Sequence, residues 1–228
     1  MTKTIILIVF IFTSSCVIKH WTERSIKQKT IAIQGFKIIL NVDGTEHPEV
    51  KEVLLVLSEK LTELTRIIKP EQLHILQTTK IWIEWEMKKD GAMEYHVSRQ
   101  WLRAHGYLVE KAKCVEINNV KNFLSWQKLN QPYMVLHELA HAYHDKFLGF
   151  ENVEIKSAYE HALKSTVYDS VPCNLGGRRR AYALNNTNEY FAELTEAYLG
   201  VNDFYPFNKV QLQEFDSLGF VIMKKTWN

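Results

Sequence analysis

The chain has 228 residues and a formal net charge of +2, with 46% hydrophobic and 24% charged residues. This composition is typical of a globular protein, and the length suits one large domain or two small ones with a real core. Basic residues are scattered among acidic ones instead of forming a stripe. The sequence therefore gives little support for nucleic-acid binding, and we expect no nucleic-acid partner.

The N-terminal segment has the pattern of an export signal. An unbroken apolar run at residues 5–12 is too short to cross a bilayer as a helix. Small residues then precede Cys16, as in the lipobox of bacterial lipoproteins, although Thr13 stands where that pattern usually has Leu. We expect a signal at residues 1–16 and a polar tether at residues 17–30. The protein would then be exported, either secreted or held at the bacterial cell envelope by a lipid on Cys16. A plain secretory signal and a buried N-terminal strand are the alternatives.

The first part of the expected domain, residues 31–131, is predicted to be a lobe that contains strands. Alternating or strand-forming residues predict strands at residues 31–42, 80–85 and 114–117. A break or bulge is expected near Gly35, and Asp43-Gly44 is a turn signal. Apolar residues at helical spacing predict helices that begin near Pro48 and at Glu71, the first of which ends before Pro70.

The second part, residues 132–228, is predicted to be mainly helical. Pro132 begins a central helix that ends at Gly149. Further helices are predicted at residues 152–167 and 189–199, and a final amphipathic helix in the tail. Thr187 or Asn188 is expected to cap the helix at 189–199. The expected fold class is α+β: a small N-terminal mixed sheet with helices, then the central helix and a helical C-terminal lobe, in one domain over residues 31–228.

Two cysteines remain beyond Cys16. Cys114 and Cys173 could form one disulfide in an oxidising compartment, or they could stay as two free thiols. No histidine close in sequence marks either one as a nucleophile.

The central helix carries the most informative motif of the chain. Residues 137–141 read His-Glu-Leu-Ala-His, which is the H-E-x-x-H pattern. Because residues i and i+4 lie on one face of a helix, His137 and His141 can bind one Zn²⁺ together. Glu138 can then act as general base towards a water on the metal. The motif indicates a metallohydrolase, and a peptidase in the first place.

A catalytic zinc usually has three protein ligands and one open position. The extended motif with a nearby third histidine is excluded, because Phe147 stands at the required position. A later predicted helix instead has Glu189, Glu193 and Glu196 at i, i+4 and i+7, beside apolar residues. We choose Glu189 as the third ligand and Glu193 as the acceptor of the outer N–H of a zinc-bound histidine. A solvated acidic face is the alternative.

The spacing of these residues resembles a known family. H-E-x-x-H at 137–141, then Tyr182, then Glu189-Tyr190-Phe191-Ala192-Glu193 is similar to the catalytic domain of anthrax toxin lethal factor and its relatives. The resemblance covers about residues 133–200, and the whole chain is closer to small bacterial proteins with the same catalytic unit. It implies a zincin-like fold and a gluzincin-like peptidase in which His137, His141 and Glu189 bind zinc and Glu138 is the base. It also implies that Tyr182 donates a hydrogen bond to the oxyanion.

The sequence therefore predicts a zinc-dependent metalloendopeptidase that acts on a peptide or protein substrate as a monomer. Substrate is expected to pair with an edge strand, for which we choose residues 115–117, the last strand before the motif. Two alternatives stay open. One is a zinc hydrolase or amidase acting on a non-peptide or cell-wall bond. The other is a binding or structural protein with this fold and no turnover, against which the presence of Glu138 argues.

Overall fold

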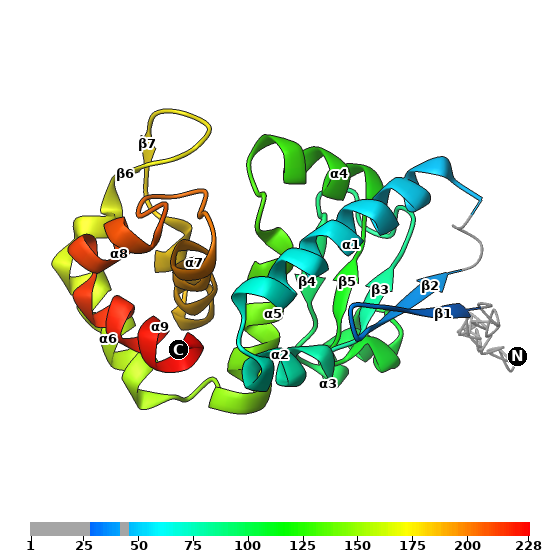
Figure 1. Ribbon diagram of the computed structural model, residues 1–228, viewed down its shortest axis with the longest axis horizontal. Helices are drawn as coiled ribbons and strands as arrows, with labels where there is room; N and C mark the ends of the chain where they lie inside the picture. The colour runs from blue at the N-terminus through cyan, green and yellow to red at the C-terminus, as the bar shows by residue number, and fades with distance from the viewer. Residues whose placement is uncertain (1–27, 42–45) are drawn as a thin grey trace, which may run out of the picture.

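The computed structural model describes residues 28–41 and 46–228. The predicted signal, Cys16, most of the predicted tether and the Asp43-Gly44 turn lie outside these residues. The described residues form a strand-containing lobe and a helical lobe, with the helix of the H-E-x-x-H motif between them (Figure 1). The fold class is α+β, as predicted.

In the described part of the chain, five strands form one mixed sheet. They are β1 (Gln28–Ile33), β2 (Phe36–Asn41), β3 (Ile81–Ile83), β4 (Met93–Tyr95) and β5 (Val115–Ile117). Their order is β1-β2-β3-β5-β4, in which β2, β3 and β5 are parallel and the outer strands are antiparallel to their neighbours. The break predicted near Gly35 is a hairpin turn between β1 and β2, where Gln34 and Gly35 both have positive φ.

The structure corrects two sequence predictions in this sheet. Residues 28–30, which the sequence places in the tether, pair with β2 as the start of β1. Their side chains are exposed, so only the pairing of the backbone distinguishes them from a polar linker. The predicted edge strand, β5, lies inside the sheet between β3 and β4. The edge beside α5 is β4, which has no β-branched residue, unlike Val115 and Ile117 of β5, so its residue types do not indicate a strand.

One face of the sheet carries the main core. Helices α1 (Pro48–Ile67), α4 (Val120–Leu129) and α5 (Met134–Tyr143) pack their apolar sides against it. Alternation along each strand sends Ile38, Ile81 and Val115 into this core, and Ile39 and Trp82 to the opposite face. Helix α1 begins at Pro48 and ends at Ile67, because Pro70 disfavours helical conformation before it. Helices α2 (Pro70–Gln77) and α3 (Arg99–Ala104) complete this lobe.

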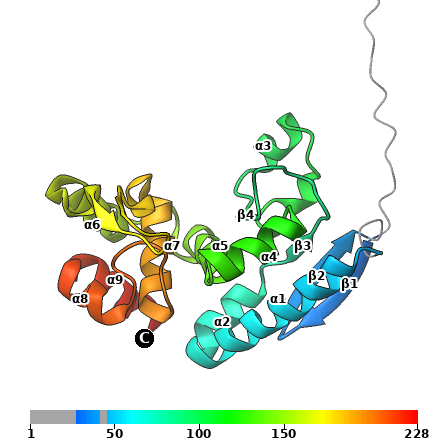
Figure 2. The same cartoon turned by 90° about the horizontal axis from the view of Figure 1, so that it is seen from above.

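The C-terminal lobe is built around one buried helix. Helix α7 (Thr187–Leu199) is surrounded by α5 and by α6 (Val153–Ser165), α8 (Lys209–Phe215) and α9 (Ser217–Trp227), as Figure 2 shows. A short hairpin of β6 (Val171–Pro172) and β7 (Arg178–Arg179) lies beside them. The predicted final helix is two helices, because Asp216 ends α8 and accepts a hydrogen bond from the amide of Gly219 in α9.

Three further observations bear on the sequence predictions. Helix α5 continues into a π-helical turn, His144–Leu148, that ends at Gly149 with a φ of 78°, so the predicted end of the helix is confirmed. Cys114 and Cys173 are both buried and are not joined by a disulfide. None of the helices in residues 28–41 and 46–228 is long and apolar enough to span a bilayer.

Candidate metal centre

Helix α5 positions the two histidines of the motif. Its apolar side is buried in the core, which fixes the rotation of the helix about its axis. His137 and His141 consequently share the face towards the C-terminal lobe, with their ring centroids 4.7 Å apart and their planes at 83°. Both side chains are 11% exposed, so they are largely shielded but reachable from solvent.

Helix α7 brings the third group to these rings. Asn186 caps α7 by accepting hydrogen bonds from the amides of Asn188 and Glu189, so the cap lies one residue before Thr187 and two before Asn188, the predicted choices. Glu189 lies in the first turn of the helix, where the helix dipole favours a negative charge. Its Oε2 is 3.0 Å from Nε2 of His137 and 3.2 Å from Nε2 of His141.

The donor set fits a zinc ion. One ligand atom from each of His137, His141 and Glu189 lies within 4.8 Å of the other two. A tetrahedral Zn²⁺ with bonds of about 2.0–2.2 Å separates its ligand atoms by roughly 3.4 Å, close to the two distances above. Two imidazoles and one carboxylate are also a ligand set that catalytic zinc uses. These side chains could therefore hold the metal without a large rearrangement.

The same contacts shift the proton affinities of these groups. Burial acts to lower the pKa of His137, but its hydrogen bonds with Glu189 and Glu196 outweigh burial and raise that pKa well above its usual value. Burial acts to raise the pKa of Glu189, but the hydrogen bonds with His137 and His141 lower it strongly. Glu189 is therefore an ionised carboxylate at every physiological pH.

A different carboxylate from the predicted one orients His137. Oε1 of Glu196 lies 2.6 Å from Nδ1 of His137, which is a hydrogen-bond distance. The closest oxygen of Glu193, the predicted acceptor, is 3.8 Å from the same nitrogen. The i+7 position of Glu196 places it opposite Nδ1 while Glu189 reaches Nε2, so the two contacts fix the orientation of the ring, and a metal at Nε2 would leave the Nδ1–H to donate to Glu196.

Glu138 faces the edge strand β4. The backbone amide of Tyr95 donates a hydrogen bond of 2.8 Å to Oε2 of Glu138. Burial raises the pKa of Glu138, while the charges of His141 and His137 act in the opposite direction. A raised pKa suits a carboxylate that takes up and releases a proton near neutral pH.

Tyr182 lies across the site from Glu138. It begins a single 3-10 turn, Tyr182–Leu184, that packs against α7. Its ring centroid is 6.4 Å from that of His137, and 45% of the residue is exposed. Burial of the rest, followed by the charge of Glu189, raises the pKa of its phenol, so the hydroxyl stays a hydrogen-bond donor.

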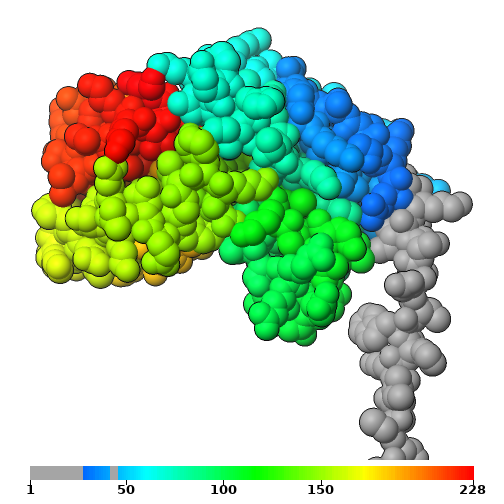
Figure 3. Space-filling model, turned by 90° about the horizontal axis from the view of Figure 1, so that it is seen from below, coloured from blue at the N-terminus to red at the C-terminus, as the bar shows by residue number. Residues whose placement is uncertain are grey.

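A cavity of about 140 Å³ lies beside His137, Glu138 and Tyr182. Its lining comes from both lobes and consists of Met93, Trp126, Gln131, Met134, His137, Glu138, Tyr182, Glu193 and Glu196. Figure 3 shows the surface hollowed between the green segments of the N-terminal lobe and the yellow-green segments of the C-terminal lobe. The site therefore lies where a substrate can contact both lobes.

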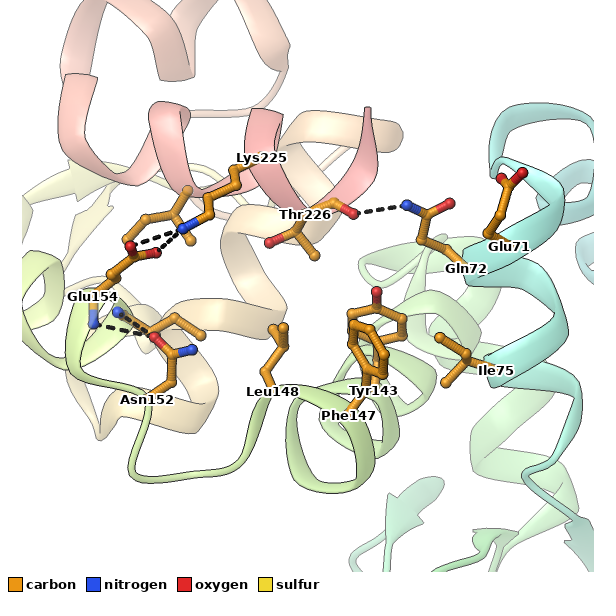
Figure 4. A pocket seen from close by; sticks show the side chains of 12 residues that line it. Glu71, Gln72, Ile75, Tyr143, Phe147, Leu148, Asn152, Glu154, Lys225 and Thr226 are labelled. Carbon is orange, nitrogen blue, oxygen red and sulfur yellow. Dashed lines mark hydrogen bonds and ion pairs between the residues drawn. The ribbon is translucent and has the colours of Figure 1, made fainter.

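A second cavity lies apart from these residues. It has a volume of about 360 Å³ and lies between α2, the end of α5 and α9 (Figure 4). Nε2 of Gln72 donates to the carbonyl of Thr226 across it, and Lys225 pairs with Glu154 at one end. It contains none of the metal-centre residues, and its contacts join the two lobes.

Two other histidines, His144 and His96, contact residues outside the proposed metal centre. His144 is fully buried and makes edge and tilted ring contacts with Phe150 and Phe191, so it is neither a ligand nor a surface residue. His96 forms a buried pair with Glu116, whose other oxygen binds the ammonium group of Lys111. That ammonium already supplies the positive charge, which disfavours a metal ion there.

Two features of the site could not be found from the motif alone. The amide of Tyr95 carries no side-chain signal, so its contact with Glu138 is visible only in three dimensions. The i+7 spacing of Glu196 from Glu189 indicates that the two share a helix face. It did not show whether Glu193 or Glu196 contacts Nδ1 of His137.

Comparisons with known proteins give one similarity. No protein-family model matches the chain, and no curated protein sequence matches it. Among solved structures, the chain is similar to the PRO-PRO endopeptidase PPEP-2 from Paenibacillus alvei. The TM-score is 0.43 and the identity 16%, over 82% of this chain and 95% of that chain.

Proposed function

We propose that the protein is a zinc-dependent metalloendopeptidase with a zincin-like fold. The observation that carries this proposal is the convergence of His137 Nε2, His141 Nε2 and Glu189 Oε2 within ligand distance, beside Glu138. A structural zinc site is normally closed by four protein ligands, whereas three ligands and a nearby acid suit catalysis. Zinc, when bound, would polarise the scissile carbonyl and lower the pKa of a water molecule.

Glu138 is the group that moves protons in this proposal. Its carboxylate accepts the proton of the attacking water and later delivers it to the leaving amine. The hydrogen bond from the Tyr95 amide occupies Oε2 and leaves the other oxygen, Oε1, for the water. The same hydrogen bond holds the Glu138 carboxylate between β4 and the three proposed zinc ligands.

Tyr182 supports the developing oxyanion. Its phenol lies in the same cavity as Glu138 and stays protonated because its pKa is raised. A hydroxyl that donates to the oxyanion strengthens its contact as the charge forms, which lowers the barrier more than it stabilises the substrate. Its exposed fraction of 45% leaves room for the side chain to adjust when substrate enters.

Strand β4 replaces β5 as the proposed substrate-binding edge. On one side β4 pairs with β5, and on the other side the Tyr95 amide points to Glu138. Because backbone groups alternate in direction along a strand, the remaining outward groups of Met93 and Tyr95 can pair with an extended peptide. A peptide bound in this way passes directly over the proposed base, which favours an endopeptidase over a hydrolase for small molecules.

Cleavage of a mixed peptide pool tests the proposal. The zinc-loaded protein should generate new peptide termini, identified by mass spectrometry, and Glu138→Gln should generate none while retaining one zinc per chain. Glu160→Gln, an exposed change on α6, is the control and should match the wild type. Stoichiometric zinc without cleavage by the wild type would reject the peptidase. Cleavage of a cell-wall or other non-peptide amide instead would support the alternative hydrolase.

A further inference from the structure

The cavity of about 140 Å³ beside the metal centre has an acidic wall, formed by Glu193 and Glu196 of α7. One oxygen of each carboxylate lies within 4.8 Å of the other and of a ring nitrogen of His137. Their side chains are only 4% and 5% exposed. Buried carboxylates are unusual unless a cation pairs with them, so this wall is suited to a positively charged group.

The protein itself supplies little positive charge to this wall. Oε2 of Glu193 accepts no hydrogen bond from any described residue, although buried acceptors normally have a donor. Within the described residues, the ion pairs of Glu193 and Glu196 are with His137 alone. An imidazole that binds a metal through one nitrogen is neutral, and the charge of a zinc ion would be balanced by Glu189 and Glu138. Two carboxylates then line the cavity without a counterion.

The rest of the cavity wall suits a long side chain. Met93, Trp126 and Met134 contribute apolar surface, and Gln131 contributes an amide. Lysine and arginine bury their methylene stems against such surface while their charged ends pair with carboxylates. At about 30 Å³ for each water molecule, the cavity has the volume of roughly four or five waters, which is enough for one such side chain.

The position of the cavity places this side chain next to the bond that is cut. His137, Glu138 and Tyr182 line the same cavity, and Met93 belongs to β4, the proposed substrate-binding edge. Successive side chains of an extended peptide point to opposite faces, so only alternate residues of a peptide paired with β4 can direct a side chain towards this cavity. The one that enters it lies beside the proposed base.

We propose that this cavity is a specificity pocket for a lysine or arginine side chain, whose charge Glu193 and Glu196 recognise. The inference rests on the proposed endopeptidase and names its substrate class: peptides with a basic residue adjacent to the cleaved bond. Burial and then the charges of Asp203 and Glu196 raise the pKa of Glu193, because a negative charge is unfavourable there without a cation. A basic side chain relieves this repulsion, and a neutral or acidic one does not.

Paired peptides that differ at one position test the recognition. The wild type should cleave a peptide with lysine beside the scissile bond at least about tenfold faster, in kcat/KM, than the same peptide with norleucine. Norleucine keeps the stem and lacks the charge, and it is placed on each side of the bond in turn. Glu193→Gln should reduce this ratio below about threefold, whereas Glu160→Gln, the exposed control on α6, should keep it.

The ratio compares each enzyme with itself, so a general loss of activity in Glu193→Gln cancels. Cleavage by the wild type without a preference for lysine on either side of the bond would overturn the pocket and leave the peptidase in place. An unchanged ratio in Glu193→Gln would also overturn it.

Binding to the inactive protein provides a test that does not require cleavage. Zinc-loaded Glu138→Gln should bind a capped penta-alanine peptide with a central lysine at least about tenfold more tightly than one with a central norleucine, measured by calorimetry. Addition of Glu193→Gln should remove the difference, with the zinc content unchanged. Preferred binding of the lysine peptide without cleavage by the wild type would uphold the pocket and reject the peptidase. Equal binding of the two peptides would overturn the pocket.

Discussion

The backbone amide of Tyr95 lies 2.8 Å from Oε2 of Glu138, so the edge strand of the sheet holds the proposed base directly. The same residue makes a second contact, in which its hydroxyl donates to Oδ2 of Asp145 over 2.7 Å. Asp145 belongs to the π-helical turn that continues α5. One residue therefore ties β4 both to the H-E-x-x-H motif and to the turn that follows it, and the strand cannot shift without moving the base.

Removal of the Glu189 carboxylate should abolish zinc binding. Glu189→Ala takes away the oxygen that lies 3.0 and 3.2 Å from the two histidines, and two imidazoles alone hold zinc far more weakly. We expect less than one tenth of an equivalent of zinc after dialysis, measured by atomic emission, and an intact circular dichroism spectrum. Glu160→Ala should retain a full equivalent. Full zinc in Glu189→Ala would show that another group completes the site.

Glu196 and Glu193 should differ in their effect on zinc affinity. Glu196→Gln removes the charged acceptor of the His137 Nδ1 hydrogen bond, and the loss of such a partner typically weakens zinc binding about 10–100-fold. Glu193→Gln should change the affinity by less than about threefold, since its oxygen is 3.8 Å away. Competition with a zinc-binding dye measures both constants. A larger loss in Glu193→Gln would restore the choice made from the sequence.

Tyr182→Phe should slow cleavage without loss of metal. Removal of one oxyanion donor typically costs about 10²–10³ in kcat, and the ring remains to pack beside His137. The KM and the zinc content should stay within about twofold of the wild type. A loss confined to KM would mean that the phenol binds substrate and does not act on the oxyanion.

His144 should make the protein less stable in acid. Burial, with a smaller effect of the charge of His141, lowers the pKa of this imidazole to about 4 in the folded chain, whereas the unfolded value is 6.5. Between these values only the unfolded chain takes up the proton, so this stability is present above pH 6.5 and is lost as pH falls towards 4. The free energy of unfolding should fall by up to about 3 kcal/mol more in the wild type than in His144→Leu over this range.

Denaturant unfolding of the metal-free proteins at pH 7 and pH 4.5 measures this difference. His161→Leu, an exposed change on α6, is the control and should follow the wild type. Parallel pH dependence in the wild type and His144→Leu would show that the buried imidazole contributes nothing to acid unfolding.

The positions of several helices follow from patterns within the sequence of each helix and at its ends. Helices α1, α5 and α7 combine apolar periodicity with proline, glycine or asparagine at their ends, so their positions were predictable. Because i and i+4 positions share a helix face, the sequence also predicts that His137 and His141 lie together. Their meeting with Glu189 depends on the packing of α5 against α7, which the spacing of the acidic residues suggests but does not determine.

The remaining features depend on contacts that no local pattern encodes. Strand β4 has no β-branched residue to indicate a strand, so the sequence assigned the sheet edge to β5. The choice between Glu193 and Glu196 is set by the rotation of α7 about its axis, which is fixed by its burial on almost every side. The export signal and the lipid on Cys16 stay predictions that the mass of the mature protein would test.

Reconstitution with zinc tests the central claim most directly. Metal-free protein, titrated with Zn²⁺, is assayed on a peptide that the wild type cleaves. We predict that the rate rises linearly and levels off at one equivalent for the wild type. Glu138→Gln should bind the same equivalent and remain at least about a thousandfold slower, as expected when the general base is lost. Cleavage that is independent of zinc, or that Glu138→Gln retains, would contradict the account.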